Sequence, residues 1–590
     1  MEMASLMHPE DSVEAEALQI LEQLKNGTKT IADLLGPLYG TRELTTEIKM
    51  RPGTKDPAPS APHAEVFPMD EHNTKLVNNV HPTDYQNPEP LEKYDLVVLG
   101  AGVSGLLSVI MGSALGKKCA LIEKHYMGGD CLNIGCVPSK ALISCARRLK
   151  EVQESAEFGV RLPEGEVTID FGAVMARMRR IRAAISDHDS VARYSRDFCE
   201  HVFLGHAEFA GPDTVRVSGA NGDVTLRFDK AMVATGASAA IVPIPGLVGA
   251  PHLTNANFFN LTELPPRVAV IGAGPIGLEM AQSLRRFGAQ VTCFEAFPQL
   301  LPREDQDAAA VLKEAILRDG VEIRLGAKIL RVEVSEEGGL YQAPWKAVRV
   351  VLDVDGAEVV HEADALLNAT GRAPNVHGIG LDVVGVEYDN KVGVHIDDQF
   401  RTTNPRVYAT GDVATPYKFT HSADFMARIA IRNMFLGDES RLSQLIIPWA
   451  TYTEPEVAHV GLYEYELESK GIEFESFKRD LKDVDRCKCE GVTEGFVKIT
   501  VKKGTDEILG ATIVGPNAGD MISELTVCIQ CNIGAGQLAG VIHPYPTTGE
   551  AIRQAAAGYN KYWRTPAVNK ALETLLQQKA EKDAAAMQEG

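Results

Sequence analysis

The sequence predicts an α/β fold, with two parallel-sheet domains of the same plan followed by an α+β domain near the C-terminal end. A buried strand at 95–99 leads into Gly100-Ala-Gly-Val-Ser-Gly105 and a helix, and a second strand then ends in Glu123. The same order returns with a strand at 268–271, Gly272-Ala-Gly-Pro-Ile-Gly277 and Glu295. In both copies the acid lies 23 residues after the first glycine, which indicates a repeated domain and not a chance motif.

Each copy has the fingerprint of a Rossmann-like dinucleotide-binding domain. Its glycines allow a tight turn and let a pyrophosphate approach the N-terminus of the helix. The acid accepts a hydrogen bond from a ribose hydroxyl. The candidate nucleotide-binding residues are Gly100, Gly102, Gly105 and Glu123 in the first copy and Gly272, Gly274, Gly277 and Glu295 in the second.

Composition limits the classes of function. The chain has 590 residues, of which 45% are hydrophobic and 24% charged, as in a globular protein of three or four domains. A net charge of −21 argues against nucleic acid or an anionic membrane as a partner. The ten cysteines are scattered, which favours a reducing compartment. No stretch is long and apolar enough for a membrane span, and the acidic N-terminus is unlike a transit peptide, so a cytoplasmic location is expected. An organelle stays open if processing removes a leader.

The order of these patterns predicts the domain boundaries. Residues 51–90 contain eight prolines and read as a linker or a strap on the surface. Strand-like runs at 496–501 and 508–514 belong to the α+β domain. The expected segments are an N-terminal extension with a helix at 12–36 (1–92), the first dinucleotide domain (93–264), the second (265–370), a return to the first (371–445), the α+β domain (446–572) and a polar tail (573–590).

The run from Gly128 to Lys140, Gly-Gly-Asp-Cys-Leu-Asn-Ile-Gly-Cys-Val-Pro-Ser-Lys, carries the strongest chemical signal. Four residues separate Cys131 from Cys136, a spacing that places both sulfurs on one side of a helical turn, within reach of a disulfide. Lys140 shares the face of Cys136, where a cation lowers a thiol pKa and stabilises negative charge on a reduced flavin. A bare pair at this spacing is more often two buried cysteines, but the flanking residues favour a redox pair.

On these residues the chain resembles the pyridine nucleotide-disulfide oxidoreductases, the family of dihydrolipoamide dehydrogenase, glutathione reductase and mercuric reductase, over roughly 93–572. The resemblance implies one FAD per subunit in the first domain, which carries the dithiol, and a nicotinamide nucleotide in the second. Glu295 stands where a 2′-phosphate would need Arg or Lys, which favours NADH over NADPH, although Arg303 argues the other way. The resemblance further implies a homodimer through the α+β domain, with each active site completed by the partner.

The resemblance also assigns individual residues. Cys136 would be the thiolate beside the flavin, and Cys131 the thiol that meets the acceptor. Glu279 is expected to pair with Lys140, and Asp412 to hydrogen-bond the ribityl chain of FAD. The remaining cofactor-binding candidates are Thr235 and Gly236 in the segment 232–236, and Gly371 and Arg372 in the segment 368–375.

The segment His543-Pro-Tyr-Pro-Thr-Thr-Gly-Glu550 departs from the His-Pro-Thr-x-Ser-Glu pattern of lipoamide and glutathione reductases, where the histidine is the acid-base. Counting back from Glu550, Tyr545 takes the histidine position, which is similar to mercuric reductase. Tyrosine titrates near pH ~10 and histidine near ~6.5, so Tyr545 exchanges protons with a disulfide substrate poorly. Hg(II) bound to thiolates demands less proton transfer. His543 stays open as the alternative acid-base.

Two features of mercuric reductase-like chains are absent. No adjacent cysteine pair stands near the C-terminus, and no Cys-x-x-Cys precedes Cys119. Cys528 and Cys531 could replace the C-terminal pair, although their apolar neighbours favour core packing. We expect no resident metal ion.

The sequence therefore predicts an FAD-dependent NAD(P)H oxidoreductase that passes electrons through Cys131 and Cys136 to a small sulfur-bound acceptor, as a mercuric reductase-like enzyme does. Tyr545 and Glu550 of the other subunit would shape the acceptor pocket. One alternative is a dihydrolipoamide dehydrogenase or glutathione reductase-like enzyme that uses His543. Another is a non-catalytic redox sensor or assembly factor whose N-terminal extension docks partners.

Overall fold

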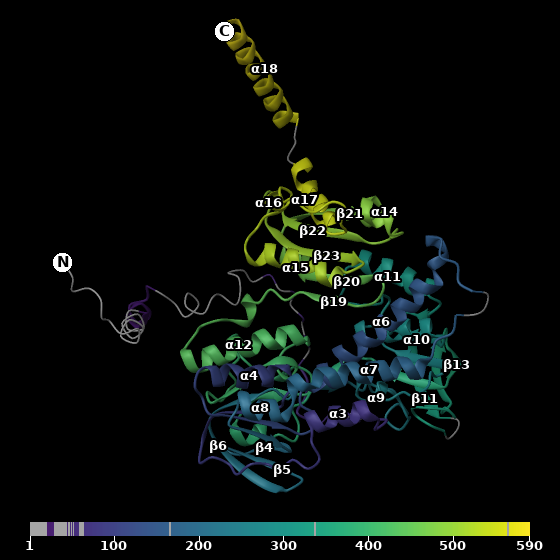
Figure 1. The fold of residues 1–590 in the computed structure, drawn as a ribbon, viewed down its shortest axis with the longest axis vertical. Helices are drawn as coiled ribbons and strands as arrows, with labels where there is room; N and C mark the ends of the chain where they lie inside the picture. Colours follow the sequence, from purple (N-terminus) through teal and green to yellow (C-terminus); the bar gives the residue numbers. More distant parts are fainter. Residues whose placement is uncertain are drawn as a thin grey trace, which may run out of the picture.

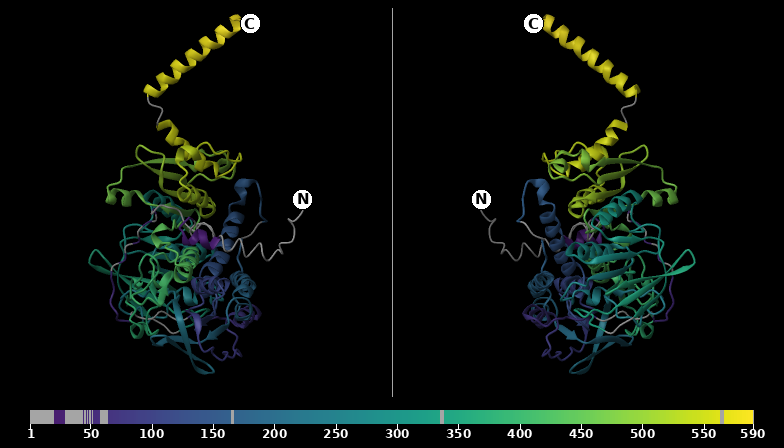
Figure 2. Two further views of the ribbon diagram at one scale, coloured as in Figure 1. Left: turned by 90° about the vertical axis from the view of Figure 1, so that its left-hand side faces the viewer. Right: turned by 90° about the vertical axis from the view of Figure 1, so that its right-hand side faces the viewer.

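A computed structural model describes residues 20–28, 44, 46, 48, 50, 52–57, 64–163, 167–334, 338–562 and 566–589. Two sheet domains lie side by side in the lower part of Figure 1, and the C-terminal domain is stacked above them. The helix α18 (Pro566–Glu589) projects away from this body in every view (Figures 1 and 2). None of the helices in the described part of the chain combines the length and the apolarity needed to span a bilayer.

The first domain contains a parallel sheet in the order β3-β2-β1-β6, with β18 added beyond β6. Its strands β1 and β2 are almost entirely buried, as expected where helices cover both faces of a parallel sheet. The strands are β1 (Tyr94–Leu99), β2 (Cys119–Glu123), β3 (His201–Leu204), β6 (Gly222–Val233) and β18 (Val407–Ala409), and β6 extends into an antiparallel ribbon with β5 (Thr214–Gly219) and β4 (His206–Gly211). The helices are α4 (Val103–Ala114), α5 (Gly129–Asn133), α6 (Cys136–Gln153), α7 (Phe171–Ile185), α8 (Val191–Asp197) and α12 (Thr420–Leu436).

The second domain repeats this plan with a parallel sheet in the order β10-β9-β8-β14. Its main helix, α10 (Pro275–Phe287), has proline at its start and is capped at its C-terminus by Gly288, whose positive φ of 114° suits glycine. The strands are β8 (Arg267–Ile271), β9 (Gln290–Phe294), β10 (Glu322–Arg324) and β14 (Ala365–Asn368), with an antiparallel sheet of β11 (Lys328–Val334), β12 (Val348–Val354) and β13 (Ala357–Ala363), and the further helices are α9 (Asn255–Phe258) and α11 (Gln306–Arg318). The pair β7 (Ala237–Ala239) and β15 (Arg372–Pro374) joins the two domains, and β16 (Tyr388–Asp389) pairs with β17 (Gly393–Val394).

The third domain is an antiparallel sheet in the order β19-β20-β23-β22-β21 with helices packed on it. This arrangement confirms the predicted fold class of two Rossmann-like domains and an α+β domain. The strands are β19 (Trp449–Thr451), β20 (Glu456–Gly461), β21 (Phe474–Asp480), β22 (Phe496–Lys502) and β23 (Ile508–Gly515), and the helices are α13 (Glu464–Lys470), α14 (Asp485–Cys489), α15 (Ala518–Gln530), α16 (Ala535–Leu538) and α17 (Glu550–Tyr562).

The described residues 64–90 differ from the linker or surface strap that the prolines of 51–90 predict. Within them α3 (Glu71–Val80) is a helix capped by Asp70, whose carboxylate accepts a hydrogen bond from the backbone N–H of Asn73 at 2.9 Å. Leu76 and Val80 are fully buried, and α3 packs against α7. Most of the helix expected at 12–36 lies outside the described residues, and residues 20–25 are helical. The polar tail expected from 573 belongs to α18, which crosses the expected boundary at 572 and has exposed side chains.

Candidate functional site

A cleft of about 2040 Å³ lies between the first two domains and reaches the third. Both glycine motifs, Cys131, Cys136 and Lys140 line it, and so do Asp412, Thr420 and residues 449–452. The helix α6 starts in the cleft and packs against α10 of the second domain. The dithiol and the two nucleotide motifs therefore share one continuous space.

The two cysteines lie on different helices and not on one helical turn as the spacing predicts. Cys131 is in α5, Cys136 is the first residue of α6, and Gly135 separates them with an irregular backbone. A Cβ at Gly135 would lie 2.7 Å from the carbonyl oxygen of Asp130, so glycine is required where the chain turns back. The two thiols are nevertheless hydrogen-bonded to each other, and Cys136 is the more exposed.

The surroundings distinguish the two sulfurs electrostatically. A hydrogen bond from Cys131 lowers the pKa of Cys136 to about 6, together with a contact to Thr420 and the charge of Lys140, although burial opposes the shift. The Thr420 hydroxyl oxygen is 3.4 Å from the Cys136 sulfur. The pKa of Cys131 is raised by the same hydrogen bond and by burial. Of the two reduced cysteines, Cys136 therefore ionises more readily than Cys131.

Lys140 is held beside this pair by the second domain. Its Nζ lies 2.9 Å from Oε2 of Glu279, whose side chain is only 6% exposed, and 4.5 Å from the ring centroid of Tyr452. Glu279 is in α10 and also accepts a hydrogen bond from the backbone N–H of Tyr452 at 2.9 Å. Helices α6 and α10 and a loop of the third domain thus meet at one lysine.

The glycine motifs fit the phosphates of two dinucleotides. A Cβ at Gly105 would lie 1.9 Å from the carbonyl oxygen of Gly100, and one at Gly277 would lie 2.0 Å from that of Gly272, so these glycines allow close packing of helix on strand. Gly102 and Gly274 differ, because their φ values of −75° and −80° are ordinary. A Cβ at Gly102 would meet its first neighbour only at 3.9 Å, and one at Gly274 would meet nothing within 4 Å. The space above both helix N-termini is left for a ligand.

The two acids occupy equivalent positions. Glu123 accepts hydrogen bonds from the backbone N–H groups of Ala101 and His125, both at 2.7 Å. Glu295 accepts from Ala273 at 2.7 Å and Phe297 at 3.0 Å. Both carboxylates line the cleft, and each oxygen keeps a second lone pair for a ribose hydroxyl. Burial raises the pKa of Glu123 against these hydrogen bonds.

The remaining cofactor-binding candidates, Thr235, Gly236, Gly371, Arg372 and Asp412, also line the cleft. Arg372 donates to Asp130 and lies 3.3 Å from Asp412, and these carboxylates outweigh burial to raise its pKa. The side chain of Thr235 donates to the backbone of Asn375 at 2.7 Å, which joins the two domain junctions. Gly236 and Gly371, with φ values of 68° and 127°, make the sharp turns there. The structure thus brings these remaining cofactor-binding candidates together at the lining of one cleft.

The C-terminal candidates lie elsewhere. No residue of 541–550, a segment the structure describes in full, lines the cleft of its own subunit. The His543 side chain is 9% exposed and is 2.8 Å from Glu524 through Nε2. Tyr545 is 70% exposed, and its hydroxyl is 3.3 Å from Asp485. Arg553 holds Glu550 at 2.9 Å, and this hydrogen bond lowers the pKa of Glu550.

The cysteines considered as a replacement metal-capturing pair do not form one surface site. Cys528 is 3% exposed and belongs to the core of the third domain, and burial raises its pKa to about 11. Cys531 caps the end of α15 and is exposed. The sequence prediction of core packing agrees with the placement of Cys528.

Three residues of the site were not predicted from sequence: Asp130, Thr420 and Tyr452. Asp130 had a local signal, since it directly precedes Cys131 at the start of a helix. Thr420 and Tyr452 had none, because 284 residues separate Thr420 from Cys136 and Tyr452 belongs to the third domain. Such long-range contacts carry no local sequence pattern.

The chain is similar in sequence to known proteins over all three of its domains. The sequence profile described as pyridine nucleotide-disulphide oxidoreductase matches residues 94–427, and that of the dimerisation domain matches 447–556. Dihydrolipoyl dehydrogenase of Geobacillus stearothermophilus is 32% identical over 463 residues, or 78% of this chain and 95% of its own. Mercuric reductase of Lysinibacillus sphaericus is 30% identical over 473 residues, or 80% of this chain and 83% of its own.

Solved structures show the same fold. LpdA from Mycobacterium tuberculosis superposes with a TM-score of 0.70 at 26% identity, over 79% of this chain and 99% of its own. The Cu(II) complex of the HOCl-induced flavoprotein disulfide reductase RclA from Escherichia coli gives a TM-score of 0.69 at 25% identity, with the same coverage.

Proposed function

Since the chain belongs to the pyridine nucleotide-disulphide oxidoreductase family, whose members use FAD and NAD(P)H, we propose that it passes electrons through Cys131 and Cys136 to a thiol-bound metal or a related sulfur-bound acceptor. One observation carries this proposal. The two hydrogen-bonded thiols and Lys140 stand in the same cleft as two phosphate cradles, so a nicotinamide, a flavin and sulfur can meet there.

The residues of the cleft have separate roles in binding the cofactors and in transferring electrons. Gly102 and Gly274 admit the pyrophosphates, and Arg372 fixes the position of Asp412 on the flavin side. Bound FAD would supply the two-electron relay between the nicotinamide and sulfur. In the overall step NAD(P)H becomes NAD(P)⁺ and supplies two electrons and one proton, solvent supplies a second proton, and the Cys131–Cys136 disulfide becomes two thiols. Loss of the Cys136 proton to solvent then leaves a thiolate beside Lys140.

Among the nicotinamides we propose NADH. The buried carboxylate of Glu295 is held by two backbone N–H groups, so it cannot swing away from a ribose 2′-phosphate, and like charges repel. Arg303 also lines the cleft and would have to overcome this repulsion to favour NADPH.

We assign the acceptor side to the partner subunit. The dimerisation domain supports a homodimer, and Val541, Ile542 and Tyr545 are 48%, 94% and 70% exposed, as expected for a surface that a partner covers. The charge of Asp485 and the hydrogen bond to it raise the pKa of Tyr545, so its phenol stays protonated at neutral pH. A phenol that donates a hydrogen bond suits a thiolate-bound metal, which needs little proton transfer.

The second candidate is a disulfide reductase that uses His543. Its Nε2 faces the Glu524 carboxylate at 2.8 Å, a histidine–carboxylate pair of the kind that proton transfer requires. The side chain is turned into its own subunit, however, whereas Tyr545 points outward. We therefore rank the thiol-bound acceptor first. A reducing, cytoplasmic location would supply such an acceptor with reduced thiols.

The test is NADH consumption by the purified FAD-loaded protein with Hg(II) in excess thiol, with oxidised glutathione, and with lipoamide. A rate that depends on Hg(II), survives His543→Ala and is lost in Cys136→Ser supports the first candidate. A rate with glutathione or lipoamide alone, lost in His543→Ala and kept in Tyr545→Phe, replaces it with the second.

A further inference from the structure

Tyr452 stands between the nicotinamide-side helix and the dithiol. Its ring lies under the Lys140 ammonium at 4.5 Å, and its backbone N–H donates to Oε1 of Glu279 while Lys140 binds Oε2 of the same carboxylate. The Tyr452 side chain is 37% exposed and lines the cleft. Lys140, Glu279 and Tyr452 therefore form a closed triangle beside Cys136.

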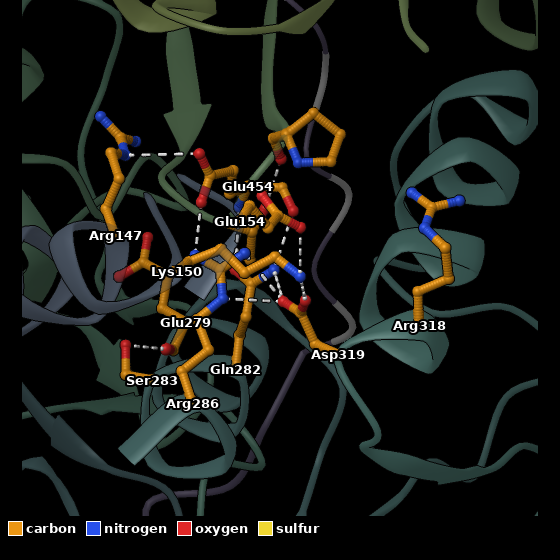
Figure 3. Close-up of polar contacts among 12 residues, drawn as sticks. Arg147, Lys150, Glu154, Glu279, Gln282, Ser283, Arg286, Arg318, Asp319 and Glu454 are labelled. Atoms are coloured by element: carbon orange, nitrogen blue, oxygen red, sulfur yellow. Dashed lines mark hydrogen bonds and ion pairs between the residues drawn. The ribbon is translucent and has the colours of Figure 1, made fainter. Parts of the chain in front are cut away.

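The loop that carries Tyr452 is fixed to α10. Gln282 donates to the backbone carbonyl of Glu454 at 2.8 Å and accepts from the backbone N–H of the same residue at 2.8 Å. The Arg286 guanidinium binds the Glu454 carboxylate and also donates to Asp319 at 2.8 Å (Figure 3). Glu279, Gln282 and Arg286 lie on one face of α10, so the helix binds the loop along two turns.

The same network of hydrogen bonds and ion pairs extends to α6, the helix that begins with Cys136. Asp319 accepts from Gln282 at 2.9 Å and pairs with Lys150 of α6 at 3.1 Å, as Figure 3 shows. The side chains of Arg286 and Asp319 are only 6% and 5% exposed. Buried charges that satisfy one another hold a single geometry, because any displacement leaves one of them unpaired. The Tyr452 loop is thus bound to α10 through Gln282, and α10 is linked to α6 through Asp319 and Lys150. These links restrict the position of the Tyr452 ring relative to α6.

A lysine with one carboxylate partner is free to rotate about it. The Lys140 side chain is 37% exposed, and four rotatable bonds connect its ammonium to the backbone. An aromatic face under the ammonium adds a favourable contact on the side that Glu279 does not cover. The attraction of a cation for a thiolate falls with distance. Keeping the Lys140 ammonium in place therefore keeps its stabilisation of the Cys136 thiolate.

We propose that Tyr452 is a positioning residue that holds the Lys140 ammonium against the Cys136 thiolate, and that the Gln282–Glu454 hydrogen bonds set the place of its ring. This inference rests on the proposed role of Cys136 as the thiolate of the reduced pair. It assigns to the third domain of the same subunit a part in the redox site.

The charged and titratable groups around Cys136 come from several elements. Cys131 faces it from α5, Lys140 from α6, Glu279 from α10 and Tyr452 from the loop before β20. Thr420 contacts it from the start of α12. Glu279 opposes the thiolate, whereas Cys131, Thr420 and Lys140 favour it. Of these groups, only Lys140 is restrained by the Tyr452 ring.

The experiment measures the pH dependence of Cys136 alkylation in the FAD-loaded protein. Cys131→Ser serves as the parent, because serine keeps a hydroxyl donor next to Cys136 and leaves one reactive sulfur. Iodoacetamide labelling of the peptide that contains Cys136 is followed by mass spectrometry from pH 5 to 9. Tyr452→Leu, Tyr452→Phe and Gln282→Met are compared with Lys140→Met. Tyr388→Leu is the matched control, since Lys55 lies 4.8 Å from the Tyr388 ring centroid and neither residue lines the cleft that holds the dithiol.

We expect Tyr452→Leu to move the midpoint upward and to slow labelling at pH 6 by about threefold to tenfold, since each pKa unit is tenfold in thiolate below the midpoint. Tyr452→Phe should keep the parent profile because the ring remains, Gln282→Met should shift it by less than Tyr452→Leu, and Tyr388→Leu should leave it unchanged. Flavin content and melting temperature report folding, and Gln282→Met carries the test if Tyr452→Leu does not fold. Parent-like profiles in Tyr452→Leu and Gln282→Met beside a shifted Lys140→Met overturn the inference alone. No shift in Lys140→Met overturns the proposed role of Lys140 as well.

Discussion

The hydroxyl oxygen of Thr420 lies 3.4 Å from the sulfur of Cys136 and connects the first residue of α12 to the first residue of α6. The contact crosses 284 residues of sequence and brings the return segment of the first domain to the dithiol. It is one of the interactions that lower the pKa of Cys136.

Thr420→Val should raise the pKa of Cys136, because the variant removes a hydrogen bond that favours the thiolate. The thiolate exists above its pKa and is lost as the pH falls through it, so a higher pKa moves this loss to higher pH. In a profile of acceptor kcat/KM against pH, we expect the acid limb to move upward by about half to one pH unit. Thr420→Ser keeps the hydroxyl and should follow the parent, and a shift as large in Thr420→Ser as in Thr420→Val would show that the hydroxyl does not set the pKa of Cys136.

Gly102→Val should yield a folded protein that does not retain FAD. The φ of Gly102 accepts any residue, and a Cβ there meets no protein atom closer than 3.9 Å, so the added side chain occupies only the phosphate space. We expect flavin absorbance per protein to fall at least about tenfold, the equivalent of ~1.4 kcal/mol in binding. Circular dichroism should resemble that of the parent stripped of FAD.

The control for this variant is Gly105→Ala. Its Cβ would lie 1.9 Å from the carbonyl oxygen of Gly100, so the substitution should lower the melting temperature of the apoprotein itself. Normal flavin content in Gly102→Val would show that the pyrophosphate does not pass this point.

NADH should be preferred to NADPH by at least about tenfold in kcat/KM, a difference of ~1.4 kcal/mol, because Glu295 repels a 2′-phosphate. Glu295→Ala should reduce the preference mainly through the KM for NADPH, as measured by steady-state kinetics with one acceptor. If the parent instead prefers NADPH and Arg303→Ala removes that preference, then Arg303 and not Glu295 sets the specificity.

A mixed dimer tests whether Tyr545 acts across the interface. Cys136→Ser and Tyr545→Ala homodimers should each lose most activity toward a thiol-bound acceptor. A heterodimer of the two, purified with separate tags, keeps one site in which an intact dithiol faces an intact tyrosine. It should therefore recover about half of the native activity, as expected for one of two symmetric sites. No recovery in a heterodimer of confirmed composition would mean that Tyr545 serves its own subunit, whereas an active Tyr545→Ala homodimer would mean that Tyr545 has no part in catalysis.

The sequence was sufficient for features that depend on neighbouring residues. The repeated glycine motifs and the acids Glu123 and Glu295 predict two sheet–helix units because a tight turn and a close helix–strand approach need those residues locally. Strands β1 and β2 could also be predicted, because strands buried on both faces of a sheet appear in the sequence as apolar runs. Helix α3 was not predicted because only three of its ten residues, Asn73, Leu76 and Val80, are buried, and one of these is polar, so its buried face leaves little apolar pattern in the sequence.

The contacts that complete the site could not be predicted in the same way. Arg372 and Asp130 are 242 residues apart, and only the closed fold sets their contact. Gly135 was visible in the sequence, but its effect, a break that puts Cys131 and Cys136 on separate helices, depends on the approach of the Asp130 carbonyl. The outward position of Tyr545 depends on how its segment folds against α14 and α15.

NADH should reduce the Cys131–Cys136 disulfide through bound FAD. The most direct test of this reduction is differential alkylation of the oxidised, FAD-loaded protein under anaerobic conditions, with and without NADH, read by mass spectrometry on the peptide that spans both cysteines. We expect an unlabelled disulfide before NADH and two labelled thiols after it. The labelling should require bound FAD and need no added acceptor. A peptide whose labelling does not change on adding NADH to the flavin-loaded protein would contradict the claim.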